Sequence, residues 1–199
     1  LGRHRRCAGV QAGMPCAPWS AMRWRRPGPE VLFRFPDEVD GVRGEDGLVL
    51  LEAQEAMRLV LAEVRILRAA HDFSVEHPVR RNTGRHALEG CERASTKWDT
   101  TPFVRLREEL RPGFVVFHQG ALGAKSQKAT LLGCSAGMLA HTRELFAGAL
   151  IDARACAGLD PEDTGALRKS EVYPGRMCER LALAWVQRAE ERGLLHEAE

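Results

Sequence analysis

The sequence predicts an α/β protein in which helices flank a mostly parallel sheet. Apolar segments typical of strands alternate with amphipathic segments typical of helices, in the order strand, helix, strand, helix, strand. One apolar segment, residues 114–117, is a continuous run, which is typical of a strand buried on both faces of a parallel sheet. With 199 residues, 44% of them hydrophobic, the chain can bury the core of a single domain.

Residues 1–30 are expected to form a basic, loop-rich segment ahead of an α/β domain at residues 31–199. Pro and Gly interrupt any longer pattern, apart from a short strand around residues 7–10. Residues 1–29 contain six arginines and no Asp or Glu, although the net charge of the whole chain is only +2. Such a start also resembles an organelle transit peptide, which is the alternative interpretation of this segment.

The clearest helix is expected between residues 47 and 70. Apolar residues recur there at helical spacing, and most charged side chains, Glu63 included, fall on the opposite side. The expected buried stripe consists of Leu50, Met57, Val60, Leu61, Val64 and Leu67. A short strand follows at residues 72–76, because Phe73 and Val75 alternate with polar residues there and Pro78 stops the pattern.

A second helix and four further elements are expected after this strand. Thr101 is a good N-cap and Pro102 suits the first helical position, so a helix begins there and ends before Pro112. The remaining elements are expected in the order strand, strand, polar loop and helix, at residues 114–117, 130–134, 160–170 and 175–192.

The six cysteines indicate a reduced, intracellular protein. None forms a C-x-x-C pair, and their spacing suits neither a zinc site nor a small disulfide scaffold. We therefore expect a nuclear location if the source is eukaryotic and a cytoplasmic one otherwise, with no bound metal. No apolar run approaches the ~20 residues of a membrane helix, so no membrane partner is expected.

Three segments that follow predicted strands carry the candidate chemistry, because sites in α/β sheets lie at the carboxyl ends of strands. The first is the loop around Cys16, which Pro15 and Pro18 stiffen. A stiff loop that presents one thiol suits a nucleophile, and its arginine-rich surroundings favour the thiolate. The alternative is a loop cysteine with no chemical role.

The second segment ends in Glu76, a carboxylate at the end of a buried strand. Such a group is costly unless it is paired or used, and it can be held protonated as a general acid. The alternative is a glutamate that reaches solvent or an arginine. His77 is not expected to share a site with Glu76, because neighbouring residues of a strand point to opposite sides.

The third segment, residues 117–130, is a strand end followed by a glycine-bearing loop with Lys125 and Lys128. Its two cations and its hydrogen-bonding side chains would suit a phosphate or the edge of a base. The alternative is a solvated basic loop.

Read in chain order, these segments and a later turn form a pattern. It consists of Pro15-Cys16-Ala17-Pro18-Trp19-Ser20, then Val75-Glu76, then Leu122–Thr130, and finally Tyr173-Pro174-Gly175 before an apolar helix. This pattern resembles the cytosine-C5 methyltransferase family. That family carries a Pro-Cys loop, a Glu-Asn-Val strand end, a loop with Gln-x-Arg-x-Arg, and a proline turn that opens a helix.

The match to the third motif is loose. Gly123 matches directly, and Lys128 falls where the first arginine should be. Thr130 replaces the second arginine, and Gln127 takes the glutamine position if the register slips by one residue. The second motif departs from the family pattern at the two residues after Glu76.

The resemblance implies a partial Rossmann-like methyltransferase fold that acts on DNA with S-adenosylmethionine as the methyl donor. It makes the Cys16 thiolate the nucleophile that adds to C6 of a flipped-out cytosine, and Glu76 the acid that stabilises protonation at N3. C5 then takes the methyl group. The other site residues that it implies are Pro15, Ser20, Arg23, Gln127 and Lys128 for the substrate, and Pro174 for the cofactor.

The family's cofactor motif, a Phe-x-Gly-x-Gly turn well before the cysteine, has no counterpart in the sequence. Gly9-Val10-Gln11-Ala12-Gly13 is no substitute. We therefore expect either an N-terminally truncated piece of a longer enzyme, which the start at Leu1 favours, or a degenerate relative that no longer methylates.

Two further interpretations stay open. One is a non-catalytic, nucleic-acid-associated protein derived from a mobile element, which would contact phosphates and bases through Arg23-Trp24-Arg25-Arg26. The other is an unrelated α/β protein. If the family resemblance holds, Cys16, Glu76 and Lys128 line one cleft at the carboxyl ends of the strands.

Overall fold

The structure is a computed structural model that describes residues 7–13, 17–19, 31–34, 36–78, 96–124, 128–149 and 173–195. The chain divides into two compact units, one up to Arg111 and one from Pro112 onward. Each unit contains two strands that pair with each other, and helices. None of the helices in these ranges is long and apolar enough to cross a membrane.

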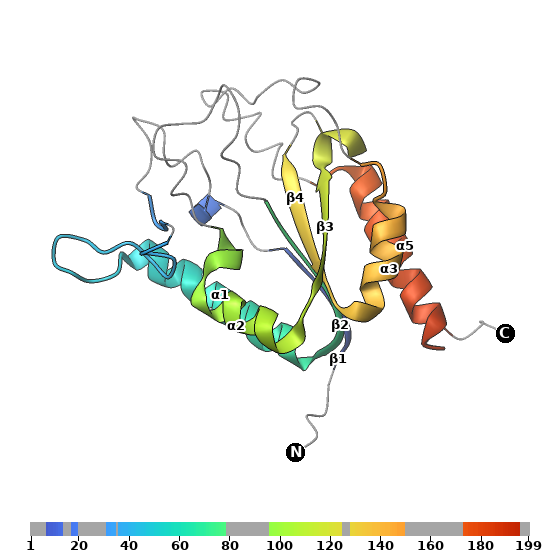
Figure 1. The fold of residues 1–199 in the computed structure, drawn as a ribbon, viewed down its shortest axis with the longest axis horizontal. Helices are drawn as coiled ribbons and strands as arrows, with labels where there is room; N and C mark the ends of the chain where they lie inside the picture. Colours follow the sequence, from blue (N-terminus) through green and yellow to red (C-terminus); the bar gives the residue numbers. More distant parts are fainter. Residues whose placement is uncertain are drawn as a thin grey trace, which may run out of the picture. The chain divides into compact units, whose positions relative to one another are not determined.

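The first unit is built on a parallel pair of strands. Its elements are β1 (Cys7–Gly13), η1 (Ala17–Trp19), α1 (Leu51–Ala69), β2 (Ala70–Pro78), η4 (Lys97–Asp99) and α2 (Thr101–Leu110). The register of β1 and β2 runs from Cys7 opposite Ala70 to Gly13 opposite Glu76. α1 lies between the two strands in the chain and packs against both, as expected of a crossover between parallel strands. α2 lies beside α1 (Figure 1).

α1 confirms the predicted helix and corrects its buried face. The buried residues are Ala53, Ala56, Val60, Glu63, Val64 and Leu67. Leu61 is 44% exposed, so its predicted burial is wrong. Since Leu61 follows Val60 by one residue, it is turned by about 100° away from the line of Val60, Val64 and Leu67.

α2 confirms the second predicted helix, with its start displaced by one residue. The N-cap is Thr100 and Thr101 is the first helical residue, so the predicted N-cap at Thr101 is wrong. The Thr100 hydroxyl donates to the Lys97 carbonyl at 2.7 Å instead of capping the helix. Arg111, in the left-handed conformation with φ of 47°, ends the helix.

The second unit is built on an antiparallel pair of strands. Its elements are β3 (Gly113–His118), η5 (Gln119–Leu122), β4 (Ala129–Cys134), α3 (Ala136–Leu145) and α5 (Gly175–Glu191). In β3 and β4, Gly113 lies opposite Cys134 and His118 opposite Ala129.

The antiparallel pair confirms the α/β class and shows that the prediction of a mostly parallel sheet is wrong. The physical reason is the connection between β3 and β4. Only residues 119–128 separate β3 from β4, whereas a parallel neighbour needs a crossover of about a dozen residues or more. Val116 is 47% exposed, so the predicted burial of β3 on both faces is also wrong. An antiparallel pair can leave one face toward water.

The core of the second unit joins the hairpin to α3 and α5. Phe117 from β3 packs on Phe146 just after α3, with ring centroids 4.6 Å apart. α5 confirms the predicted last helix, and its stripe of Met177, Leu181 and Ala184 is buried in this core. α3 was not predicted. Gly137 in α3 lies so close to α5 that an added Cβ would stand 2.4 Å from the Arg188 guanidinium.

Candidate functional site

Glu76 lies at the carboxyl end of β2 and is only 2% exposed. The last residue of β1, Gly13, is its partner in the ladder. Because the two strands are parallel, they end at the same edge of the pair, with their backbones about 4.8 Å apart. Gly13, where β1 ends, therefore lies directly beside Glu76.

Three buried rings hold η1 against the end of β2. Trp19, the last residue of η1, stacks on Phe33 with ring centroids 4.8 Å apart and planes 15° apart. The ring of His77 meets Trp19 edge to face, at 5.6 Å and 84°. All three side chains are buried. The chain that follows Cys16 is thus fixed to the residue next to Glu76.

A buried ion pair in the same unit was not predicted. The ammonium Nζ of Lys97 donates to both carboxylate oxygens of Glu63, at 3.0 Å and 3.2 Å. The side chains are 0% and 6% exposed. Nζ also lies 5.6 Å and 5.3 Å from the ring centroids of Trp98 and Phe103. Burial raises the pKa of Glu63, the charge of Lys97 opposes that rise, and the charge of Glu76 adds to it.

One signal in the sequence could have revealed Glu63. It follows Val60 by three residues and precedes Leu67 by four, a spacing that places it on the apolar stripe of α1. A charge on the buried face of a helix needs a partner. That partner has no local signal, because Lys97 lies 34 residues further along the chain.

In the second unit, two segments that match the family pattern lie close together, the one that contains Lys128 and the one that contains Tyr173. Lys128 precedes β4, and its Nζ lies 5.9 Å from the ring centroid of Tyr173, which stands just before α5. Lys128 has a φ of 24°, a conformation that residues with a side chain rarely adopt. Thr130, by contrast, is buried and accepts a hydrogen bond from Gln119 Nε2 at 3.1 Å. Thr130 is therefore a packing residue and does not substitute for an arginine.

Pro174, the described residue that the resemblance assigns to the cofactor, lies just before the first residue of α5. The Pro174 carbonyl accepts hydrogen bonds from the amides of Met177 and Cys178, at 2.9 Å and 3.2 Å, so it serves the start of α5. The glycine-bearing stretch from Gly9 to Gly13 is strand paired with β2, and it makes no turn that could cradle a cofactor. Within the described ranges, no three His, Cys, Asp or Glu side chains cluster to hold a metal ion.

The other predicted site residues lie outside the described ranges. These are Pro15, Cys16, Ser20, Arg23 and Gln127. The predicted cleft that joins Cys16, Glu76 and Lys128 stays a prediction, since Glu76 and Lys128 belong to different units. The expected polar loop at residues 160–170 and the Arg23–Arg26 cluster also lie outside the described residues.

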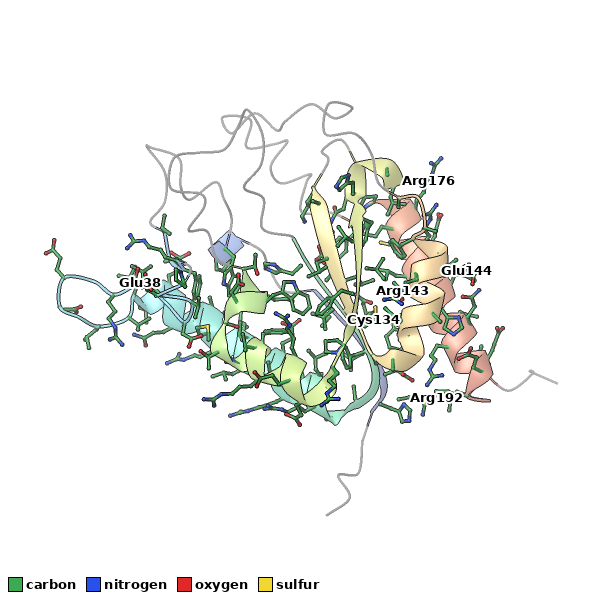
Figure 2. The ribbon with its side chains drawn as sticks, viewed as in Figure 1. Glu38, Cys134, Arg143, Glu144, Arg176 and Arg192 are labelled. Atoms are coloured by element: carbon green, nitrogen blue, oxygen red, sulfur yellow. The ribbon has the colours of Figure 1, made fainter. Side chains whose placement is uncertain are left out.

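Two thiols in the described ranges differ in reactivity. Cys134, at the end of β4, points toward α3, where its Sγ lies 3.6 Å from the Thr142 hydroxyl (Figure 2). Burial raises the pKa of this thiol to about 11, so it holds little thiolate at neutral pH. Cys178, on α5, is an exposed free thiol.

The scan against protein-family models and the searches of curated proteins and of solved structures found no match to this chain. The fold class and the geometry of the two units are therefore the basis for a functional proposal.

Proposed function

We propose that this chain is a cytosine-C5 methyltransferase-like protein that binds DNA and adds the Cys16 thiolate to C6 of a flipped cytosine. One observation carries the proposal: Gly13 pairs opposite Glu76, so the segment that bears Cys16 starts beside a buried carboxylate. Attack needs the sulfur within about 3–3.5 Å of C6. Protonation at N3 needs an acid at hydrogen-bond distance on the other side of the same ring.

The reaction balances as a reversible addition. The sulfur forms a bond to C6, the electrons of the C5–C6 double bond shift into the ring, and the proton of Glu76 passes to N3. C5 then has carbanion character and takes an electrophile. Loss of the original hydrogen from C5, return of the N3 proton to Glu76 and cleavage of the sulfur–C6 bond regenerate the aromatic ring and the thiolate.

S-adenosylmethionine is the methyl donor that the resemblance implies. The first half of the reaction does not need a methyl donor, so it can be tested without one. Addition at C6 alone lets C5 exchange its hydrogen with water. A duplex that carries tritium at C5 of its cytosines therefore reports the first half of the reaction.

The test measures tritium released into water from this duplex by the whole chain. We expect release above the protein-free rate, and a loss of at least about 100-fold in Cys16→Ser and in Glu76→Gln, the usual range for a nucleophile or general acid. Cys178→Ser is the matched control, because it removes an exposed thiol remote in sequence, and it should release tritium at the wild-type rate.

Three results would overturn the proposal. Release that persists in Cys16→Ser removes that thiol from the chemistry. Equal loss in Cys178→Ser shows that the assay reports damage and not mechanism. Binding of the duplex by a folded wild-type chain without any release favours the non-catalytic, nucleic-acid-associated alternative.

A further inference from the structure

We propose that the outer face of α1 binds a second copy of this chain, with the two helices antiparallel. This face carries an apolar stripe in which each residue follows the last by three or four positions: Leu59, Ala62, Ile66 and Ala69. All four are exposed, and the two large side chains, Leu59 and Ile66, are 51% and 53% exposed. Such spacing is typical of the seam between two paired helices. The stripe is turned away from the buried face of α1, so packing within the unit does not use it.

The stripe is complementary to itself when two copies of α1 run antiparallel. Its side chains alternate in size, since the small Ala62 separates the large Leu59 and Ile66. A two-fold axis between residues 60 and 61 places Leu59 opposite the partner's Ala62, and Glu55 opposite the partner's Ile66. Large side chains then fill the space beside small ones, and each contact occurs twice, as a two-fold interface requires. A second copy of the chain therefore fits this face.

The charges beside the stripe favour the antiparallel orientation. Glu55, Arg58 and Arg65 are exposed, and none of them has an ion-pair partner within the described part of the chain. In this register Glu55 lies level with the partner's Arg65, because Arg65 adjoins Ile66, and Arg58 follows Glu55 by one turn. A parallel pair would instead set Glu55 against the partner's Glu55 and Arg65 against the partner's Arg65. Like charges in those positions would repel, so the charge pattern selects one orientation.

The strength of the dimer follows from the size of the contact. One helix from each copy makes a small interface, in the class of transient contacts that bury less than about 1,200 Å² in total. We therefore expect a Kd in the micromolar range, so that the dimer forms at high concentration and dissociates on dilution.

The first arm of the test measures the Kd by sedimentation velocity on the whole chain, over a dilution series from high micromolar to submicromolar. Leu59→Glu places a charge in the seam and should raise the Kd at least about tenfold. Leu61→Glu is the matched control. Leu61 is 44% exposed on the same helix, but it is turned by about 200° from Leu59, so its substitution should leave the Kd within about threefold of wild type.

The second arm tests the orientation through the charges. Glu55→Arg and Arg65→Glu each turn two attractive contacts into repulsive ones, and each should raise the Kd by about 5- to 10-fold. The double variant Glu55→Arg/Arg65→Glu exchanges the two charges and should recover a Kd within about threefold of wild type. Far-UV circular dichroism and the melting temperature at low concentration check that every variant is folded.

Three results would overturn the inference, and none of them depends on the proposed reaction. A wild-type chain that stays monomeric over the whole dilution series has no such interface. A Kd that is unchanged in Leu59→Glu, or raised equally in Leu61→Glu, places any dimer contact on another surface. A double charge variant no tighter than Glu55→Arg alone refutes the antiparallel pairing of Glu55 with the partner's Arg65.

Discussion

Removal of Lys97 should be among the most destabilising single changes in the first unit. Lys97→Met deletes the ammonium that donates to both oxygens of Glu63 and leaves that carboxylate buried. Loss of one partner of a buried ion pair typically costs about 3–5 kcal/mol. We expect the cost of Lys97→Met to fall within that range, because both side chains of the pair are almost completely removed from water, at 0% and 6% exposed.

The double variant Glu63→Leu/Lys97→Met should recover most of this loss. It replaces both charges with apolar side chains of similar size, a change that is often neutral or stabilising in other proteins, by about 1–4 kcal/mol. The free energy of unfolding from urea denaturation, followed by far-UV circular dichroism and by tryptophan fluorescence, measures each value. Arg65→Met, which removes an exposed cation from the same helix, is the matched control and should stay within about 0.5 kcal/mol of wild type.

The cost of Lys97→Met should also depend on pH in a defined direction. Burial raises the pKa of Glu63 above its ordinary value of 4.5. A carboxyl group with a raised folded-state pKa contributes stability that is present below the unfolded pKa and is lost as pH rises through the folded pKa. Without the ammonium this effect grows, so Lys97→Met should be closest to wild type near pH 4 and furthest from it above pH 7.

Two results would refute this reasoning. A loss below about 1 kcal/mol at pH 7 would mean that the ammonium carries no net stabilisation for the buried carboxylate. A double variant no more stable than Lys97→Met would show that packing around the Lys97 stem, and not the unpaired charge, sets the cost.

Three further predictions follow from the second unit. Gly113→Ala should destabilise it by about 1–3 kcal/mol, because an added Cβ would stand 2.1 Å from Leu139 Cδ2; calorimetry measures the loss, and Leu139→Ala should relieve it. Iodoacetamide at pH 8 should modify Cys178 at least about 100-fold faster than Cys134, whose thiol has a pKa of about 11; equal rates would contradict its burial. Hydrogen bonds from the His141 imidazole on α3 and the Arg188 guanidinium on α5 lower the pKa of Glu191. The loss of stability in Glu191→Gln should therefore be seen above pH 4.5 and disappear as pH falls through the lowered pKa. A loss that is the same at pH 3 and pH 7 would contradict this.

The elements of this fold were predictable where their signal is local. α1 and α5 follow from apolar residues at helical spacing, and β2 follows from alternation up to Pro78. The direction of β4 is different, because it depends on which strand is its neighbour. A count of the residues between His118 and Ala129 would have shown that no crossover fits there.

α3 lacked a comparable signal. Only Met138 and Thr142 of its side chains are buried, so the stripe that marks a helix is short and includes a polar residue. The burial of Thr142 depends on bonds to Met138 and Cys134, which local periodicity does not report. The same limit applies to the site. Glu76 could be singled out as a strand-end carboxylate, whereas its proximity to Gly13 depends on the ladder register, and the Trp19–His77 contact depends on the packing of residues 58 positions apart.

The distribution of buried polar groups separates the two units. Among the described residues, the buried Asp, Glu, His and Lys side chains are Glu63, Asp72, Glu76, His77 and Lys97, all in the first unit. The buried polar side chains of the second unit are uncharged: Gln119, Thr130, Ser135 and Thr142.

This asymmetry bears on where chemistry can occur. A buried charge is costly to keep away from water unless it is paired or used, as Glu63 is paired with Lys97. Neutral hydroxyls and amides that bond to each other or to the backbone, as in the second unit, need no such account. Perturbed and buried charges gather where proteins handle protons. The edge where β1 and β2 end together, beside the buried Glu76, is therefore the part of the described chain with the strongest physical argument for acid–base chemistry.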